Sequence, residues 1–220
     1  MSADAESSGA AGRGFGLVPL DCPACGAPLA AEETDVVFYC TACRTGYRYA
    51  PAEKRGLAPV EVSFIATPHR AAEGYAPFWL LPARVEIVRR DAGGGALSGL
   101  LRYFAGGDEG AQAGDGHFVL PAFRLPIAEA VELALRYTQE FPRLDELLGE
   151  RLTGGNFGAE DAVTLAHYVL IASEVRKRDM LKDFEYRLTA GEPRLLGVPW
   201  VTVPPRRVDA VFGLSMGARL

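Results

Sequence analysis

The stretch that decides the fold reads Cys22-Pro23-Ala24-Cys25, followed after 14 residues by Cys40-Thr41-Ala42-Cys43. These four cysteines are the only ones in the chain. Each C-x-x-C turn is a clip that directs two thiolates to one point, and four thiolates form a tetrahedral donor set. The spacing therefore predicts one metal site, and zinc is the ion that such a set of sulfur ligands favours.

The residues around the clips fit tight turns and short strands. Gly26 follows the first clip, where a knuckle turn needs a positive φ angle, and Pro23 stiffens the clip itself. The β-branched and aromatic run 36–39 predicts a strand, and 47–49 predicts the returning strand. Because all four donors are thiolates, the predicted site has no position for substrate or water, and its metal has a folding role.

Two C-x-x-C knuckles around a short hairpin resemble the zinc-ribbon class over about residues 17–50. The resemblance implies a small β structure that depends on one structural Zn²⁺ held by the four cysteines. The second knuckle departs from the pattern, because Arg44 follows Cys43 and glycine comes only at Gly46. The departure concerns the geometry of the second turn and not the ligation.

Three other interpretations compete with structural zinc. Disulfides are disfavoured by the paired clips and by an intracellular setting. A thioredoxin-like redox site needs one C-x-x-C that opens a helix after a strand, whereas this chain has two clips in turns. Iron in a rubredoxin-like site takes the same ligands, but that resemblance implies a longer spacer.

Composition predicts a folded chain. It has 220 residues, of which 49% are hydrophobic and 23% charged, enough for one core of ordinary size beside a small ribbon. No apolar run approaches the roughly 20 residues of a membrane span. Residues 1–14 lack the basic and apolar regions of a signal peptide, so we expect a disordered tail there. Together these features predict a cytoplasmic protein with reduced cysteines.

The net charge of −5 is unevenly distributed. Residues 174–220 carry a balance of +3, and residues 1–173 carry −8. The ribbon itself, residues 21–55, has 4 basic and 5 acidic side chains, and a zinc tetrathiolate adds about −2. Nucleic-acid binding needs a cationic surface near phosphate, so the acidic ribbon weighs against it.

The rest of the chain predicts an α+β domain over residues 60–220, behind a zinc ribbon at 15–50 and a linker at 51–59. We expect Phe78 and Trp79 to fill the core, because aromatic side chains bury large apolar areas. Apolar periodicity separates the strands from the helices. The expected strands cover 60–65, 83–88, 117–124, 183–188 and 195–203, and the expected helices cover 126–140, 144–152 and 159–178.

A glycine-rich insertion at 91–116 has nine glycines in 26 residues around an apolar island at 96–104. Glycine adds chain entropy without burial, so the segment is expected to be flexible. Two interpretations stay open. The island is either part of a hairpin tip packed on its own domain, or an arm that becomes ordered on a partner.

Three functions follow from these patterns. The first is a zinc-binding adaptor or assembly protein that acts through protein–protein contacts, with purely structural zinc and no catalytic residue. The second is a nucleic-acid-binding protein that grips with its ribbon and with the basic 174–220 segment. The third is an enzyme in which His69, His117 or His167 works with a carboxylate such as Asp115 or Glu86, although no motif joins these residues.

Overall fold

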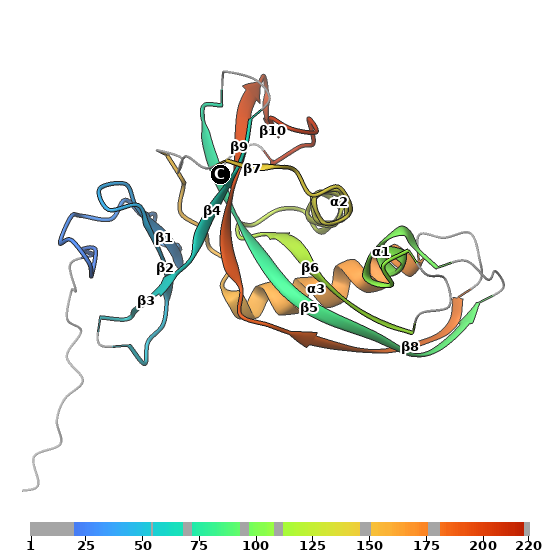
Figure 1. The fold of residues 1–220 in the computed structure, drawn as a ribbon. Coiled ribbons are helices and arrows are strands. Elements are labelled where there is room, and N and C mark those ends of the chain that lie inside the picture. Colours follow the sequence, from blue (N-terminus) through green and yellow to red (C-terminus); the bar gives the residue numbers. More distant parts are fainter. Residues whose placement is uncertain are drawn as a thin grey trace, which may run out of the picture.

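A computed structural model of the chain describes residues 20–53, 55–67, 72–92, 97–107, 112–145, 151–175 and 181–217. The tail expected at 1–14 lies outside these ranges. Figure 1 shows a small sheet with the N-terminal strands on one side and a larger curled sheet with helices on the other. This is the α+β class predicted from the sequence.

The small sheet has three antiparallel strands in the order β1-β2-β3, and its first two strands match the predicted hairpin. The third strand begins at Leu57, so the linker expected over 51–59 is a strand in its last three residues. Leu57 and Ala58 are buried, and pairing with β2 removes them from water. The strands are β1 (Val37–Cys40), β2 (Thr45–Tyr49) and β3 (Leu57–Val60).

The larger sheet is built around β5 (Gly74–Ala92), a bent strand of 19 residues. β6 (Ala113–Pro121) runs antiparallel along one edge of β5. β8 (Leu181–Ala190) and β9 (Arg194–Val203) follow the other edge end to end, so that β5 is paired along its length (Figure 1). The antiparallel neighbours β5 and β6 were both predicted.

Two short strands pair with β9 on the side away from β5. β4 (Val62–Ile65) pairs with the start of β9 in parallel, and β10 (Arg206–Asp209) pairs with its end. Pro199 lies between these two partners, where β9 needs no donor on that side. β9 is therefore an inner strand with a local gap at Pro199.

The structure contradicts the helix predicted over 144–152 at both of its described ends, and residues 146–150 lie outside the described ranges. Residues 144–152 were expected to be helical, but β7 (Leu144–Asp145) pairs antiparallel with β4, and Leu152 makes a β-bridge to Tyr75. The backbone is also bonded to the sheet through the Ala66 N–H and the Arg143 carbonyl, at 2.9 Å. Sheet pairing thus outweighs the local helical pattern.

The apolar island of the glycine-rich segment forms α1 (Gly99–Phe104). Leu100, Leu101 and Phe104 are buried in the main core, and a side chain at Gly114 would collide with the Phe104 carbonyl. The idea that this island is an arm waiting for a partner is therefore wrong. The hairpin interpretation holds, because α1 packs on its own domain.

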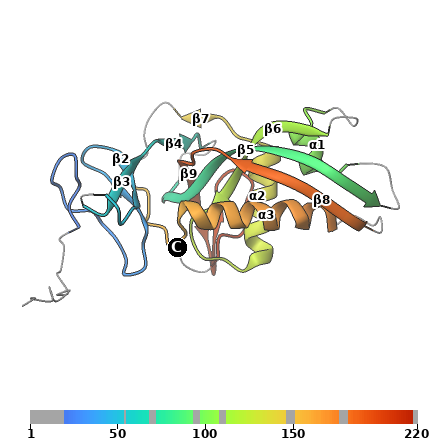
Figure 2. The same ribbon diagram turned by 90° about the horizontal axis from the view of Figure 1, so that it is seen from below.

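Two longer helices cover the curled sheet. α2 (Ile127–Gln139) begins after Pro126, as predicted, and packs on β6. α3 (Ala159–Val175) lies along β5, β6 and β8, and Figure 2 shows it extended along one face of the sheet. The core beneath them contains the fully buried Trp79, as expected. No helix within the described ranges is long and apolar enough to cross a membrane.

Candidate metal centre

The two knuckles adopt the same turn. The Gly26 N–H donates to the Cys22 carbonyl at 2.9 Å, and the Arg44 N–H donates to the Cys40 carbonyl at 2.7 Å. Gly26 has the predicted positive φ of 76°, and Arg44 reaches a φ of 60° despite its side chain. The missing glycine after the second clip therefore does not change the turn, although a side chain there is strained.

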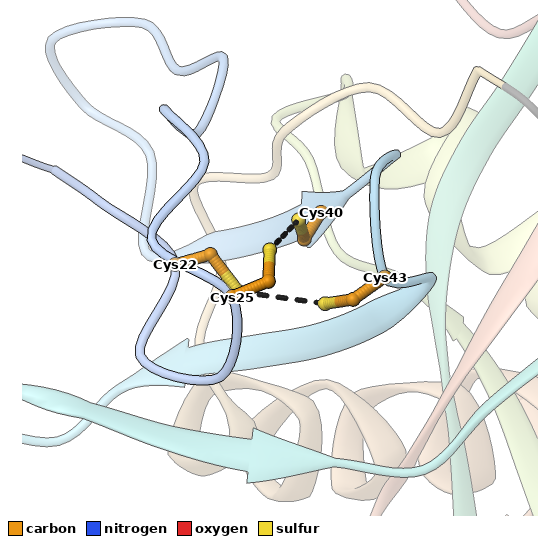
Figure 3. A group of neighbouring side chains, drawn as sticks. All are labelled: Cys22, Cys25, Cys40 and Cys43. Carbon is orange, nitrogen blue, oxygen red and sulfur yellow. Dashed lines mark hydrogen bonds between the residues drawn. The ribbon is translucent and has the colours of Figure 1, made fainter.

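The turns bring all four predicted ligands together (Figure 3). The sulfurs of Cys22 and Cys43 lie 3.5 Å apart, those of Cys25 and Cys40 lie 3.6 Å apart, and all four sulfurs lie within 4.8 Å of one another. A tetrahedral zinc with bonds of about 2.3 Å has sulfur–sulfur edges of about 3.8 Å. All four cysteines are free thiols, and their geometry fits a metal site.

The surroundings bury one side of the site. Cys22 and Cys40 belong to a small apolar cluster with Phe38, whereas Cys25 is exposed. Tyr47 lies in the same cluster, and its hydroxyl is 3.3 Å from the sulfur of Cys22. Tyr47 lies on the returning strand β2 and contacts the candidate metal ligand Cys22. The sequence pattern did not identify this contact.

The thiols influence each other's ionisation. Burial raises the pKa of Cys22, but hydrogen bonds from the Tyr47 hydroxyl and from backbone N–H groups outweigh it and lower that pKa to about 6. The Ala27 N–H lowers the pKa of Cys25, yet burial and the other three sulfurs raise it to about 12. Four thiolates this close need a cation between them, and an all-sulfur donor set fits zinc.

Strand β1 connects the cysteine cluster with the main core. Phe38 and Cys40 face the cysteine side, while Val37 and Tyr39 point the other way and are buried in the main core. The ring of Tyr39 packs edge-on against Phe64 of β4, with 5.7 Å between the centroids. The strand that carries a metal ligand is therefore also part of the core of the larger domain.

A short loop, residues 153–157, holds β1 against the larger sheet, and we name it the joint loop. The Gly155 carbonyl accepts hydrogen bonds from Val36 at 2.7 Å and Val37 at 2.9 Å, and its N–H donates to Val37 at 3.2 Å. A Cβ at Gly155 would lie 2.6 Å from the Ala122 carbonyl oxygen. Glycine is therefore required where β1 and the sheet meet, and the joint loop leads directly into α3.

The histidines considered for catalysis lie apart on different elements. His117 on β6 is 2.9 Å from the Tyr103 hydroxyl, and His167 on α3 is 2.9 Å from the Tyr186 hydroxyl. His69 lies outside the described residues. Each of the two described histidines is thus paired with a tyrosine from its own neighbourhood.

The carboxylates considered with them are in cross-strand ion pairs. Asp115 pairs with Arg84 at 2.9 Å, and Glu86 pairs with Arg187 at 3.6 Å. Among the described residues, the four cysteines are the only group of three or more potential metal ligands close enough to share an ion. Among the described members of the suggested catalytic set, no hydrogen bond or ion pair joins a histidine to a carboxylate.

A second feature was missed from the sequence. On α3, Tyr168, Ile171 and Val175 are 59%, 43% and 63% exposed, and with the exposed Thr164 they form one row. We name this row the outward face of α3. The sequence did hold a sign of this exposed face. The segment that forms α3 is apolar on all sides, although a helix at the surface buries only one side.

No family model matches the chain, and neither the curated proteins nor the solved structures compared with it gave a match. The four-cysteine site and the outward face of α3 are therefore the two features that bear most directly on function.

Proposed function

We propose that this protein is a zinc-stabilised adaptor or assembly protein that acts through protein–protein contacts. The four cysteines hold one Zn²⁺, and all its coordination positions are filled by sulfur, so the metal has a structural role. Reduced thiols of this kind are typical of the cytoplasm, which is the location we propose.

The outward face of α3 carries the proposal. Three large apolar side chains lie exposed in a row, although the opposite side of the same helix already fills the core. An exposed apolar row costs free energy in water and gains it when another protein covers it. Positions three and four apart are also those that a helix presents to a partner surface. The partner is therefore a protein with a complementary apolar face.

The metal stabilises the platform that presents this face. The cysteines fix β1, β1 is hydrogen-bonded to the joint loop, and the joint loop leads into the first turn of α3. The structural ion and the contact surface are thus joined by a short continuous path.

Nucleic-acid binding and catalysis have no comparable support. Asp21, Glu32 and Glu33 are exposed on the described part of the ribbon, and they repel phosphate. The described histidines are hydrogen-bonded to tyrosines and do not converge. We therefore propose neither.

Site-specific photocrosslinking tests the proposal. A benzophenone amino acid replaces Tyr168 in the full chain in its native cells, and the same amino acid replaces the 58% exposed Ile127 of α2 as a matched control. We expect adducts of defined mass from position 168 that are lost when Ile171→Lys is added. Absence of adducts at 168, or the same adducts at both positions, would contradict the proposal.

A further inference from the structure

Two long strands, β6 and β8, lie at edges of the large sheet, and the structure covers them differently. On β6, the Val119 N–H donates to the Thr138 hydroxyl of α2 at 2.9 Å, and the His117 N–H donates to the Tyr103 hydroxyl of α1 at 3.3 Å. β8 pairs with β5 on one side, and no strand among the described residues pairs with its other side. Figure 1 shows β8 at the lower margin of the sheet. Within the described ranges, the edge of β6 is therefore capped by side chains and the edge of β8 is open.

The open edge of β8 presents backbone groups at every second residue. The Gly191 N–H, directly after β8, donates to the Pro82 carbonyl of β5 at 2.7 Å. Backbone groups along an antiparallel strand point to alternate sides, so those of Tyr186, Leu188 and Ala190 point away from β5. The register shifts in this pair add residues to β5 between positions 87 and 89, and none to β8 there, so the alternation continues. Such a row of N–H and C=O groups is a template for a further strand.

The side chains of β8 divide between two faces of the sheet. Phe184, Tyr186 and Leu188 are half-buried and pack against the main core. Glu185 and Arg187 are exposed on the opposite face. A strand that joins this edge has to keep the same division, because a shift by one residue exchanges the two faces.

Charge then favours one register for a second, antiparallel copy of β8. With a two-fold axis at Tyr186, Glu185 of each copy lies opposite Arg187 of the other. An axis at Glu185 or at Arg187 instead sets two like charges against each other. Glu185 has no ion pair among the described residues, and Arg187 reaches Glu86 only at 3.6 Å with both side chains exposed. Both charges are therefore accessible to a second copy.

We propose that β8 pairs with β8 of a second copy of this chain, antiparallel, about a two-fold axis at Tyr186. On the core-facing side, the same axis places Phe184 of each copy opposite Leu188 of the other, so apolar residues also meet. The contact is isologous and continues the sheet from one copy into the other. It uses neither the outward face of α3 nor the cysteines, so it goes beyond the proposed function and is tested separately. Few side chains contribute, so the pair is expected to dissociate on dilution.

Sedimentation equilibrium of the full, reduced chain tests this inference. We expect a concentration-dependent dimer that weakens with added salt. Glu185→Arg and Arg187→Glu should each raise the dimer dissociation constant about tenfold or more, because two attractive pairs become repulsive. The double variant exchanges the two charges and should return the constant close to the wild-type value. Asp115→Arg is the matched control, since it makes the same charge change at an exposed position on the capped strand β6, and it should leave the constant unchanged.

Amide hydrogen exchange, followed by NMR at high and low protein concentration, tests whether the backbone forms the contact. The N–H groups of Tyr186 and Leu188 gain partners in the dimer and should exchange more slowly at high concentration. The Arg187 N–H points to β5 and should exchange equally at both. A wild-type chain that stays monomeric, a dimer that tolerates Glu185→Arg, or a double variant that does not recover overturns the inference. Equal exchange of Tyr186 and Leu188 at the two concentrations overturns it as well.

Discussion

The residue after each knuckle shapes the turn that directs the sulfurs. Gly26 and Arg44 have positive φ angles of 76° and 60°, and each donates its N–H to the first cysteine of its own clip. A residue with a Cβ is strained in this conformation by about 1 kcal/mol, whereas glycine is not. The two knuckles therefore adopt the same kind of turn, and the turn at Arg44 has the higher conformational free energy.

Substitutions at these two positions should act in opposite directions. Gly26→Ala should lower the free energy of unfolding by about 1 kcal/mol, because a Cβ there meets no neighbour and adds only backbone strain. Arg44→Gly should raise it by up to about 1 kcal/mol, since the strain is relieved. Urea unfolding of the metal-loaded protein measures both. Two changes of the same sign would contradict the shared turn.

His117 makes stability depend on pH. Burial lowers its pKa below the ordinary value of 6.5, and the charge of Arg194 lowers it further. Between the folded and unfolded pKa values the unfolded chain binds more protons, so stability rises with pH across that window. The stability is complete above 6.5 and is lost as pH falls toward the lower folded pKa.

His117→Gln should therefore flatten the acid side of the stability curve. Urea unfolding at a series of pH values from about 7.5 to about 5 compares the variant with the wild type. The difference between the two curves isolates His117 from the thiols, which titrate in both proteins. Parallel curves would show that the imidazole does not resist protonation in the folded state.

At the scale of elements, β1 has two buried faces that serve different clusters. Val37 faces the main core, and Cys40 faces the cysteine cluster. Because both faces belong to one short strand, a shift of β1 in the main core also shifts Cys40 in the cysteine cluster. Metal binding and core packing are therefore linked through this strand.

Val37→Ala should reveal this link. The truncation leaves a cavity in the main core and should lower the free energy of unfolding by about 2 kcal/mol. It should also weaken metal affinity, measured by competition with a chelator, although residue 37 is not a ligand. A variant with reduced stability and unchanged metal affinity would show that the two clusters are independent.

Gly155 in the joint loop and Gly158 directly after it form a matched pair of glycines. Gly155→Ala brings a Cβ within 2.6 Å of the Ala122 carbonyl oxygen, so β1 or the sheet has to shift. Gly158→Ala meets only ordinary contacts, the nearest at 3.7 Å to Asp161. We expect a lower melting temperature and faster metal release for the first variant only. Equal melting temperatures and equal rates of metal release for the two variants would show that the joint loop does not hold β1 in place.

Much of this architecture can be predicted where a pattern is local. Clip spacing predicts the cysteine cluster, and strong periodicity predicts β5, β6, β8 and α3. The predictions that were wrong concern residues whose structure depends on tertiary contacts. Leu144 and Asp145 join the sheet, where the start of a short helix was expected, because β4 offers them backbone partners. Leu57 extends the ribbon because a buried cluster lies beside it. Which side of α3 faces outward is decided by the sheet it covers.

At the scale of the whole molecule, we expect the small N-terminal sheet and the larger domain to fold together. The small sheet contributes Val37 and Tyr39 to the main core, and the joint loop is hydrogen-bonded to β1. With the structural zinc that we propose, a sheet of this size depends on its metal for folding, by on the order of 10 kcal/mol. The shared core extends that dependence to the larger domain, and through the joint loop to the start of α3.

X-ray absorption at the zinc edge, on the purified and reduced full chain, tests the central claim most directly. We expect one zinc per chain with four sulfur neighbours at about 2.3 Å and no nitrogen or oxygen neighbour. A chain with clearly less than one metal ion, or a zinc with a nitrogen or oxygen ligand, would contradict it.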